Sequence, residues 1–154
     1  MAAFRDRVAR CDELPDDACE PGLRALRGGE RSQIKPANSR SLEGSVDLDT
    51  ALKAHPSHAQ ASRWDYAVGY DGQVWFIEFH PVSDGDASVV GRKADWLDRW
   101  LDGPGRPLAE ITSGPYYWIA TGGVPSARQR KKVTAMAQRG VRMVGSSLTL
   151  PPGR

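Results

Sequence analysis

The stretch RWDYAVGYDGQVWFIEFHPV, residues 63–82, decides the fold because it reads as two strands joined by a tight turn. Asp71-Gly72 is among the strongest signals for a two-residue hairpin, since a type I′ turn needs a positive φ at both central positions. Counting outward from this turn pairs Asp65 with Glu78. Directly opposed carboxylates destabilise a hairpin. The pairing therefore predicts a compensating cation, and a divalent metal ion with oxygen ligands is the economical candidate.

The two faces of this hairpin differ in composition. One face is continuously apolar and aromatic and is expected to pack on a core helix; it comprises Trp64, Tyr66, Val68, Tyr70, Trp75, Ile77 and Phe79. The other face carries the two acids, and the same register places Arg63 opposite His80 beside them. The alternative is an exposed acid pair, but Ala67, Val74 and Phe76 on that face suit open solvent poorly.

Length and composition favour one domain. The chain has 154 residues, of which 40% are hydrophobic, enough for a sizeable core. We divide the single domain 1–154 into three parts. They are an N-terminal helical and irregular segment (1–41), a core (42–121), and a basic helix with a final strand (122–154).

Several features predict a cytoplasmic protein without a membrane partner. No apolar run reaches the roughly 18 residues that a transmembrane helix requires. The first residues contain no apolar region typical of a signal peptide. Cys11 and Cys19 lack the spacing and histidine partners of a zinc site. They are therefore interpreted as ordinary thiols in a reducing compartment.

The remaining elements follow from hydrophobic period and from capping residues. Helices are predicted over residues 3–11, 23–29, 87–103 and 127–139. Residues 44–52 are predicted as a strand, or a strand entering a short helix, and further strands over 115–121 and 141–150. This order predicts an α/β fold: a three-layer sandwich with helices on both faces of a central mixed sheet that contains the antiparallel hairpin.

An Asp on one strand and Glu-x-basic on the next, followed by a helix and a strand, resembles the PD-(D/E)xK nuclease superfamily. The match consists of Asp65 and the tripeptide Glu78-Phe79-His80. The resemblance covers roughly residues 42–121 and implies a restriction-endonuclease-like fold. Two positions depart from the family pattern: His80 stands where Lys is usual, and Trp64 rather than Pro precedes the Asp.

Lys93 is a candidate for the missing lysine, because in some members of the superfamily that lysine has moved to the following helix. It lies on the same helical stripe as Trp96, Leu97 and Trp100. A lysine on an apolar stripe needs a partner or an outlet to solvent. The carboxylates of the sheet would be that partner; the alternative is a side chain that extends to solvent from the margin of the stripe.

The resemblance implies hydrolysis of phosphodiesters in DNA or RNA with Mg²⁺ or Mn²⁺. Asp65, Glu78 and the backbone carbonyl of Phe79 would hold the ion, which polarises the phosphate and activates a bound water. A cation, either Lys93 or protonated His80, would orient that water or neutralise developing charge. Neutral His80 would also ligate a softer ion, and Mn²⁺ accepts imidazole better than Mg²⁺ does.

Many members of the superfamily carry a further acid upstream. The candidates are Glu43, Asp47 and Asp49, and Asp47 is preferred among them, although a strand acid that faces solvent is the alternative. His55 and His58 lie in a loop, and the sequence shows no metal partner for them.

Positive charge is concentrated after residue 120, where seven basic residues and no acidic one occur. The predicted helix there contains Arg128, Arg130, Lys131 and Lys132. A basic surface of this kind suits contact with nucleic-acid phosphates. The alternative is a solvated helix face that keeps the protein soluble.

A second function stays open: a nuclease-like module without catalysis that binds a protein or nucleic-acid partner. The His at position 80 favours this reading, and Lys93 on the apolar stripe favours the nuclease. A second copy of the chain or another protein is a further candidate partner.

Overall fold

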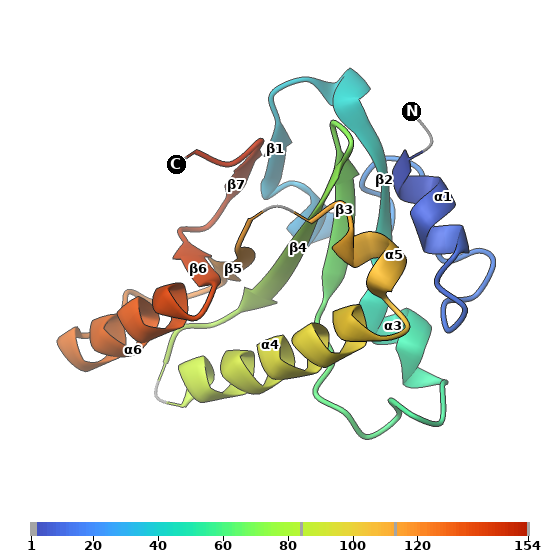
Figure 1. The fold of residues 1–154 in the computed structure, drawn as a ribbon. Helices are drawn as coiled ribbons and strands as arrows, with labels where there is room; N and C mark the ends of the chain where they lie inside the picture. The colour runs from blue at the N-terminus through green and yellow to red at the C-terminus, as the bar shows by residue number, and fades with distance from the viewer. Residues whose placement is uncertain (1–2, 84, 113, 154) are drawn as a thin grey trace.

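A five-stranded mixed sheet forms the centre of the computed structural model, which describes residues 3–83, 85–112 and 114–153 (Figure 1). In order across the sheet, the strands are β2 (Leu42–Asp47), β3 (Tyr66–Tyr70), β4 (Gln73–His80), β5 (Tyr116–Ala120) and β6 (Val141–Val144). The first three pair antiparallel, whereas β4, β5 and β6 pair parallel. The mixed α/β architecture is therefore the one that the sequence predicts.

The β3–β4 hairpin has the predicted turn and register. Asp71 and Gly72 both have positive φ angles, 51° and 80°, as a type I′ turn requires. Tyr70 pairs with Gln73, and Tyr66 pairs with Ile77. The same register, continued outward, places the start of β3 beside the end of β4, where the two acids lie.

Helices cover one face of the sheet (Figure 1). They are α1 (Ala3–Ala9), α3 (Leu48–Lys53), α4 (Asp86–Asp102), α5 (Arg106–Ala109) and α6 (Ala127–Gln138). The long helix α4 buries the apolar stripe predicted from its sequence, and it packs with Ala67, Val74 and Phe76 of the hairpin in one core cluster. Helix α6 starts with a capping box between Ser126 and Gln129.

The opposite face is covered by a small parallel sheet. Its strands are β1 (Ile34–Pro36) and β7 (Leu148–Leu150). Leu148 and Leu150 share a second core cluster with Tyr66, Ile77 and Phe79. The prediction that this face of the hairpin packs on a core helix is therefore wrong: the helix α4 lies on the acid face instead.

Two other predicted elements also differ. Residues 23–26 form hydrogen-bonded turns, and the single-turn helix α2 (Gly28–Arg31) starts only at the glycine pair that was expected to end a helix. A 3-10 turn, η1 (Ser39–Ser41), precedes β2. The last predicted strand, residues 141–150, divides into β6 and β7, which belong to different sheets.

The alternation of the first hairpin strand does not extend before Tyr66. Trp64 lies in the core cluster of the helical face, so its predicted face is wrong. Arg63 does not flank the acid pair either; its guanidinium donates to Asp49 and to backbone carbonyls including that of His58. The reason is that residues 62–65 lie outside the strand, where side chains no longer alternate with period two.

Among the described residues, no helix has the length and apolar character needed to cross a membrane. Cys11 and Cys19 are both free thiols.

Candidate functional site

Asp65 and Glu78 lie side by side where β3 begins and β4 approaches its end. The backbone N–H of Asp65 donates to Glu78 Oε1 (3.0 Å), and the backbone N–H of Phe79 donates to Asp65 Oδ2 (3.0 Å). The Glu78 side chain is fully buried, whereas that of Asp65 is 20% exposed. Each acid therefore accepts a backbone hydrogen bond from the opposite side of the hairpin through one oxygen, and its other oxygen remains for another partner.

Lys93 of α4 supplies that partner. Its Nζ lies 2.5 Å from Glu78 Oε2 and 3.7 Å from Asp65 Oδ1. The ammonium thus lies against both carboxylates, and it provides the compensation for which the sequence predicts a cation. The alternative of a lysine directed to solvent does not describe its position, since its side chain is only 20% exposed.

The electrostatics of this group favour the uptake of a proton. Burial raises the pKa of Glu78 to about 8, and the charge of Asp65 acts in the same direction against the opposing effect of Lys93. Burial also raises the pKa of Asp65. For Lys93 burial alone would lower the pKa, but the two carboxylates outweigh it and the pKa is raised. The two acids thus share the single positive charge of Lys93. The group can therefore accept a second positive charge.

His80 lies next to this group and is oriented by Asp86. Its Nε2 lies 2.8 Å from Asp86 Oδ1, and its Nδ1 lies 3.9 Å from Glu78 Oε2. Asp86 also accepts the backbone N–H and the hydroxyl of Ser83. Burial alone would raise the pKa of Asp86, but these bonds from Ser83 and His80 lower it. An ionised carboxylate only accepts hydrogen bonds, so His80 Nε2 carries a proton.

The backbone at His80 is fixed by the neighbouring strand. Trp118 Nε1 and the backbone N–H of Thr121 both donate to the carbonyl oxygen of His80, at 2.9 and 3.1 Å.

Asp86 was missed as a functional residue, because from the sequence it reads only as part of a loop with helix-capping residues. An acid in the first turn of a helix, six residues after a motif histidine, is the signal that would have indicated it.

Asp65 is reached from solvent through a pocket of about 170 Å³ at the same edge of the sheet. Its lining consists of Arg27, Glu30, Asp47, Asp49, Asp65, Tyr66 and Phe79. A larger pocket of about 370 Å³ shares Arg27, Glu30 and Phe79 with it and extends to Thr121 and Ser146. The two pockets make the end of β4 accessible from the face opposite α4.

The three candidate upstream acids, Glu43, Asp47 and Asp49, differ in their position relative to the site. Asp47 shares the smaller pocket with Asp65, but its carboxylate caps α3 by accepting the backbone N–H and the hydroxyl of Thr50, both at 2.9 Å. Asp49 lines that pocket too and pairs with Arg63. Glu43 accepts backbone N–H groups of Phe4 and Gly72 near the hairpin turn, so it does not belong to the site.

Among the described residues, the basic side chains of α6 form no ion pair with Asp65 or Glu78. Arg128, Arg130, Lys131 and Lys132 are all exposed. The loop before α6 follows the end of β5, and its Gly122 carbonyl accepts the backbone N–H of Val82 (3.4 Å). Of the other basic residues in this part of the chain, Arg139 pairs with Asp95 and Asp98, and Arg154 lies outside the described residues.

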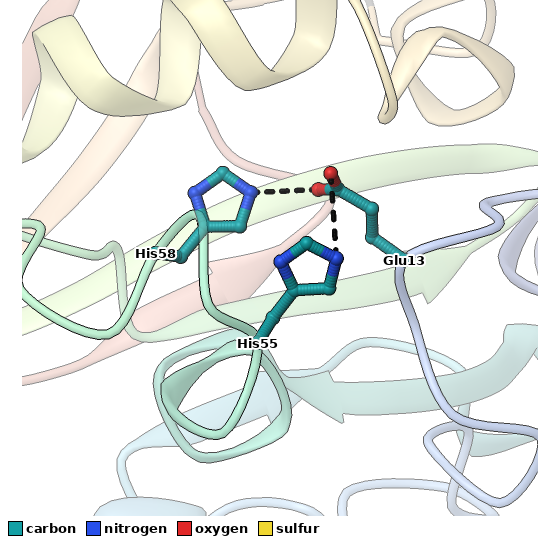
Figure 2. A group of neighbouring side chains, drawn as sticks. All are labelled: Glu13, His55 and His58. Carbon is teal, nitrogen blue, oxygen red and sulfur yellow. Dashed lines mark hydrogen bonds and ion pairs between the residues drawn. The ribbon is translucent and has the colours of Figure 1, made fainter.

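A second group of acid and histidine side chains lies elsewhere: Glu13, His55 and His58 (Figure 2). His58 Nε2 is 2.6 Å from Glu13 Oε1, and His55 Nε2 is 3.7 Å from Glu13 Oε2. In the part of the chain that the structure describes, it is the single group of three such residues whose ligand atoms all lie within 4.8 Å. No local pattern indicates this group, because Glu13 is more than forty positions away from the histidines.

These three ligand atoms are close enough to hold a metal ion, but the hydrogen bonds around them fit a different role. Trp96 Nε1 donates to His58 Nδ1 (3.1 Å), and the backbone N–H of Ser57 donates to His55 Nδ1 (3.2 Å). A neutral ring whose Nδ1 accepts a hydrogen bond carries its proton on Nε2. Both N–H groups therefore face Glu13, which also accepts Trp100 Nε1 (3.1 Å).

A metal ion bound through these Nε2 atoms would need the ring protons on Nδ1. With the proton on Nδ1, the Nδ1–H of His58 would point at the Nε1–H of Trp96. Trp96 is almost fully buried, so neither group could turn to water instead. Ligating histidines ordinarily donate their other ring N–H to an acceptor. The group is accordingly arranged as a hydrogen-bonded hub that ties the loop of residues 54–62 and the segment after α1 to helix α4.

No protein-family model, no curated protein and no solved structure matches this chain.

Proposed function

We propose that the protein is a metal-dependent nuclease that hydrolyses phosphodiesters at the site formed by Asp65, Glu78 and Lys93. The observation that carries this proposal is their convergence: two acids from a hairpin and a lysine from the next helix meet within 3.7 Å at one sheet edge. The resemblance to the PD-(D/E)xK superfamily pairs these residue types with this chemistry.

The donor set fits a hard divalent cation. Mg²⁺ and Mn²⁺ favour carboxylate and carbonyl oxygens, and Asp65 and Glu78 each direct one oxygen toward Lys93. These two acids, with the carbonyl of Phe79, would hold the ion; Asp47 at the pocket would join them only by releasing Thr50. When bound, such an ion polarises the scissile phosphate and lowers the pKa of a bound water.

The side chains around the ion would divide the remaining work. Lys93, displaced from Glu78, would donate to the phosphate and neutralise developing charge. The lone pair of His80 Nδ1 faces the acids and would bind the ion or accept a proton from water. The exposed basic residues of α6 would contact the flanking phosphates.

A second candidate is a binding module without catalysis. It is favoured by the 2.5 Å contact of Lys93 with Glu78, which neutralises the acid without any metal ion. The basic face of α6 would then serve binding alone.

Cleavage assays distinguish the two. Wild type, Glu78→Gln and Lys93→Ala are incubated with single-stranded DNA, double-stranded DNA and RNA, each with Mg²⁺, Mn²⁺ or EDTA. Glu110→Gln is the matched control, because Glu110 is half-exposed and lies in an ion pair with Arg7. We expect metal-dependent cleavage by wild type and the control, and none by the two site variants.

Melting temperatures are recorded with and without metal for each protein. Failure of wild type to cut any substrate, combined with no rise of its melting temperature on addition of metal, would reject the nuclease and leave the binding module.

A further inference from the structure

His80 differs from an ordinary surface histidine because a dedicated acid fixes its ring. Asp86 comes from the first turn of α4 and is itself held by two hydrogen bonds from Ser83. It accepts the Nε2–H of His80 at 2.8 Å. In a neutral imidazole the other nitrogen then carries the lone pair, so Nδ1 is an acceptor.

That lone pair faces the acid pair. His80 Nδ1 lies 3.9 Å from Glu78 Oε2, and among the described residues no N–H group donates to it. Metal–ligand bonds of about 2.0–2.3 Å place two donors of one ion roughly 3–4.5 Å apart. The distance between these two atoms is therefore one that a shared ion spans without a change of backbone.

The carboxylate behind the ring completes the usual environment of a metal-binding histidine. Such histidines almost always donate their second ring N–H to a carboxylate or carbonyl, which fixes the tautomer and makes the ligand more basic. Asp86 stands in this place for His80, whereas the N–H groups of Trp96 and Ser57 occupy the corresponding places at His58 and His55.

We infer that Asp86 is a positioning residue that presents His80 Nδ1 to a metal ion shared with Glu78, and that the site thereby prefers ions that accept imidazole, such as Mn²⁺, over Mg²⁺. This inference rests on the metal site of the proposed function. Its selectivity follows from the donor set, since imidazole suits first-row transition ions while Mg²⁺ prefers oxygen alone.

The test measures metal binding rather than cleavage. The dissociation constants of Mn²⁺ and Mg²⁺, each as the only divalent ion, are measured by calorimetry for wild type and Asp86→Asn. Asp95→Asn is the control, because Asp95 also lies on α4 but pairs with Arg139 at the surface. An Asn side chain can turn its N–H₂ toward Nε2, which would move the ring proton to Nδ1.

We expect Asp86→Asn to weaken Mn²⁺ binding by about 10- to 100-fold, the usual cost of losing an outer-shell partner. Mg²⁺ binding should hardly change, and the control should match wild type for both ions. An unchanged ratio of Mn²⁺ to Mg²⁺ affinity in Asp86→Asn would overturn the inference.

Two NMR measurements on wild type keep the inference testable if the variant does not fold. In metal-free protein, nitrogen-15 correlation spectra should show His80 protonated at Nε2 only. Substoichiometric Mn²⁺ should then broaden the His80 ring signals before those of His55 and His58. A proton on His80 Nδ1 in metal-free protein, absence of Mn²⁺ binding, or earlier broadening of His58 each contradict the inference.

The outcome is separable from that of the proposed function. Mn²⁺ binding through His80 without cleavage of any substrate would retain the inference and reject the nuclease. Cleavage with an Asp86→Asn protein that binds Mn²⁺ as wild type does would retain the nuclease and reject the inference.

Discussion

His58 lies beside Glu13, and His80 lies beside Glu78. Both rings carry their proton on Nε2, yet His58 turns Nε2 toward its glutamate whereas His80 turns Nδ1 toward its own. His58 directs its N–H at Glu13 across 2.6 Å, while His80 directs its lone pair at Glu78 across 3.9 Å. Distance alone would select the first pair as the metal site. The partners of the other ring nitrogen, Trp96 in one case and Asp86 in the other, favour the second.

A metal site is thus defined by the protons around it as much as by its ligand atoms. A donor behind the ring, such as Trp96, turns the histidine into a hydrogen-bond donor toward the acid. An acceptor behind the ring, such as Asp86, leaves the lone pair for a cation.

The largest expected effect concerns which acid binds metal. Glu78→Gln should lose Mn²⁺ affinity by more than the roughly 10- to 100-fold that outer-shell changes cost, because an amide keeps the shape of the side chain without its charge. Glu13→Gln should retain the affinity of wild type. Calorimetric titration of both variants measures this, and loss of Mn²⁺ binding in Glu13→Gln alone would reverse the comparison.

Removal of the hub acid should instead weaken the fold. Glu13→Ala leaves the N–H groups of His58 and Trp100 without their acceptor, and buried donors without a partner cost about 1–3 kcal/mol each. We expect the free energy of unfolding to fall by about 2–4 kcal/mol in urea titrations. Glu110→Ala, which loses one surface ion pair, should cost under about 1 kcal/mol; equal losses would argue against a hub.

The raised pKa of Glu78 predicts how stability depends on pH without metal. Between pH 4.5, the ordinary pKa of a glutamate, and pH 8, its approximate pKa in the folded protein, the folded state binds more protons than the unfolded state. Stability contributed by protonated Glu78 is present below pH 4.5 and is lost as the pH rises to about 8.

Relative to Glu78→Gln, wild type should therefore lose about 1–3 kcal/mol of unfolding free energy between pH 5 and pH 8. Urea titrations at several pH values in EDTA measure the difference. A difference that stays constant, or grows in favour of wild type with rising pH, would show that the ion pair with Lys93 dominates over burial.

The smallest expected effect tests whether the edge that presents His80 is also the edge that meets nucleic acid. Replacement of Arg128, Arg130, Lys131 and Lys132 by Ala should weaken binding and reduce its salt dependence. The slope of log K against log salt should fall by about 0.7–0.9 for each phosphate contact removed.

A charge-matched control replaces four exposed arginines outside α6: Arg5, Arg10, Arg24 and Arg40. Fluorescence anisotropy with labelled DNA and RNA, at salt concentrations from low to physiological, measures both slopes. If the α6 variant keeps the wild-type slope, or the control loses as much, the basic helix face serves solubility.

The hairpin and helix α4 were predictable because their signals are local. Asp71-Gly72 fixes the turn, and the register follows by counting. The helical period places Lys93 on a buried stripe, and the need of a buried ammonium for a partner leads to the acids. These inferences use neighbours within one or two elements, so the sequence contains everything that they need.

The hub and the cover of the second face were not predictable, because their parts are distant in the chain. Nothing near Glu13 indicates His58, and nothing near Ile34 indicates Leu148. The side chains that cover a hydrophobic strand face need only be apolar, so the hairpin itself cannot tell a helix from a small sheet. The predicted face of Trp64 is wrong for a related reason. Alternation assigns a side chain to a face only within a strand, and Trp64 lies before the strand begins.

The pairing of β1 with β7 has a consequence for how the protein is made. Residues more than one hundred positions apart form this small sheet, and its leucines cover the side of the hairpin that carries Tyr66 and Phe79. Contacts between such distant segments form late, because a long loop must close first. During synthesis on a ribosome, the part of this apolar face that Leu148 and Leu150 cover therefore stays exposed until those residues have emerged.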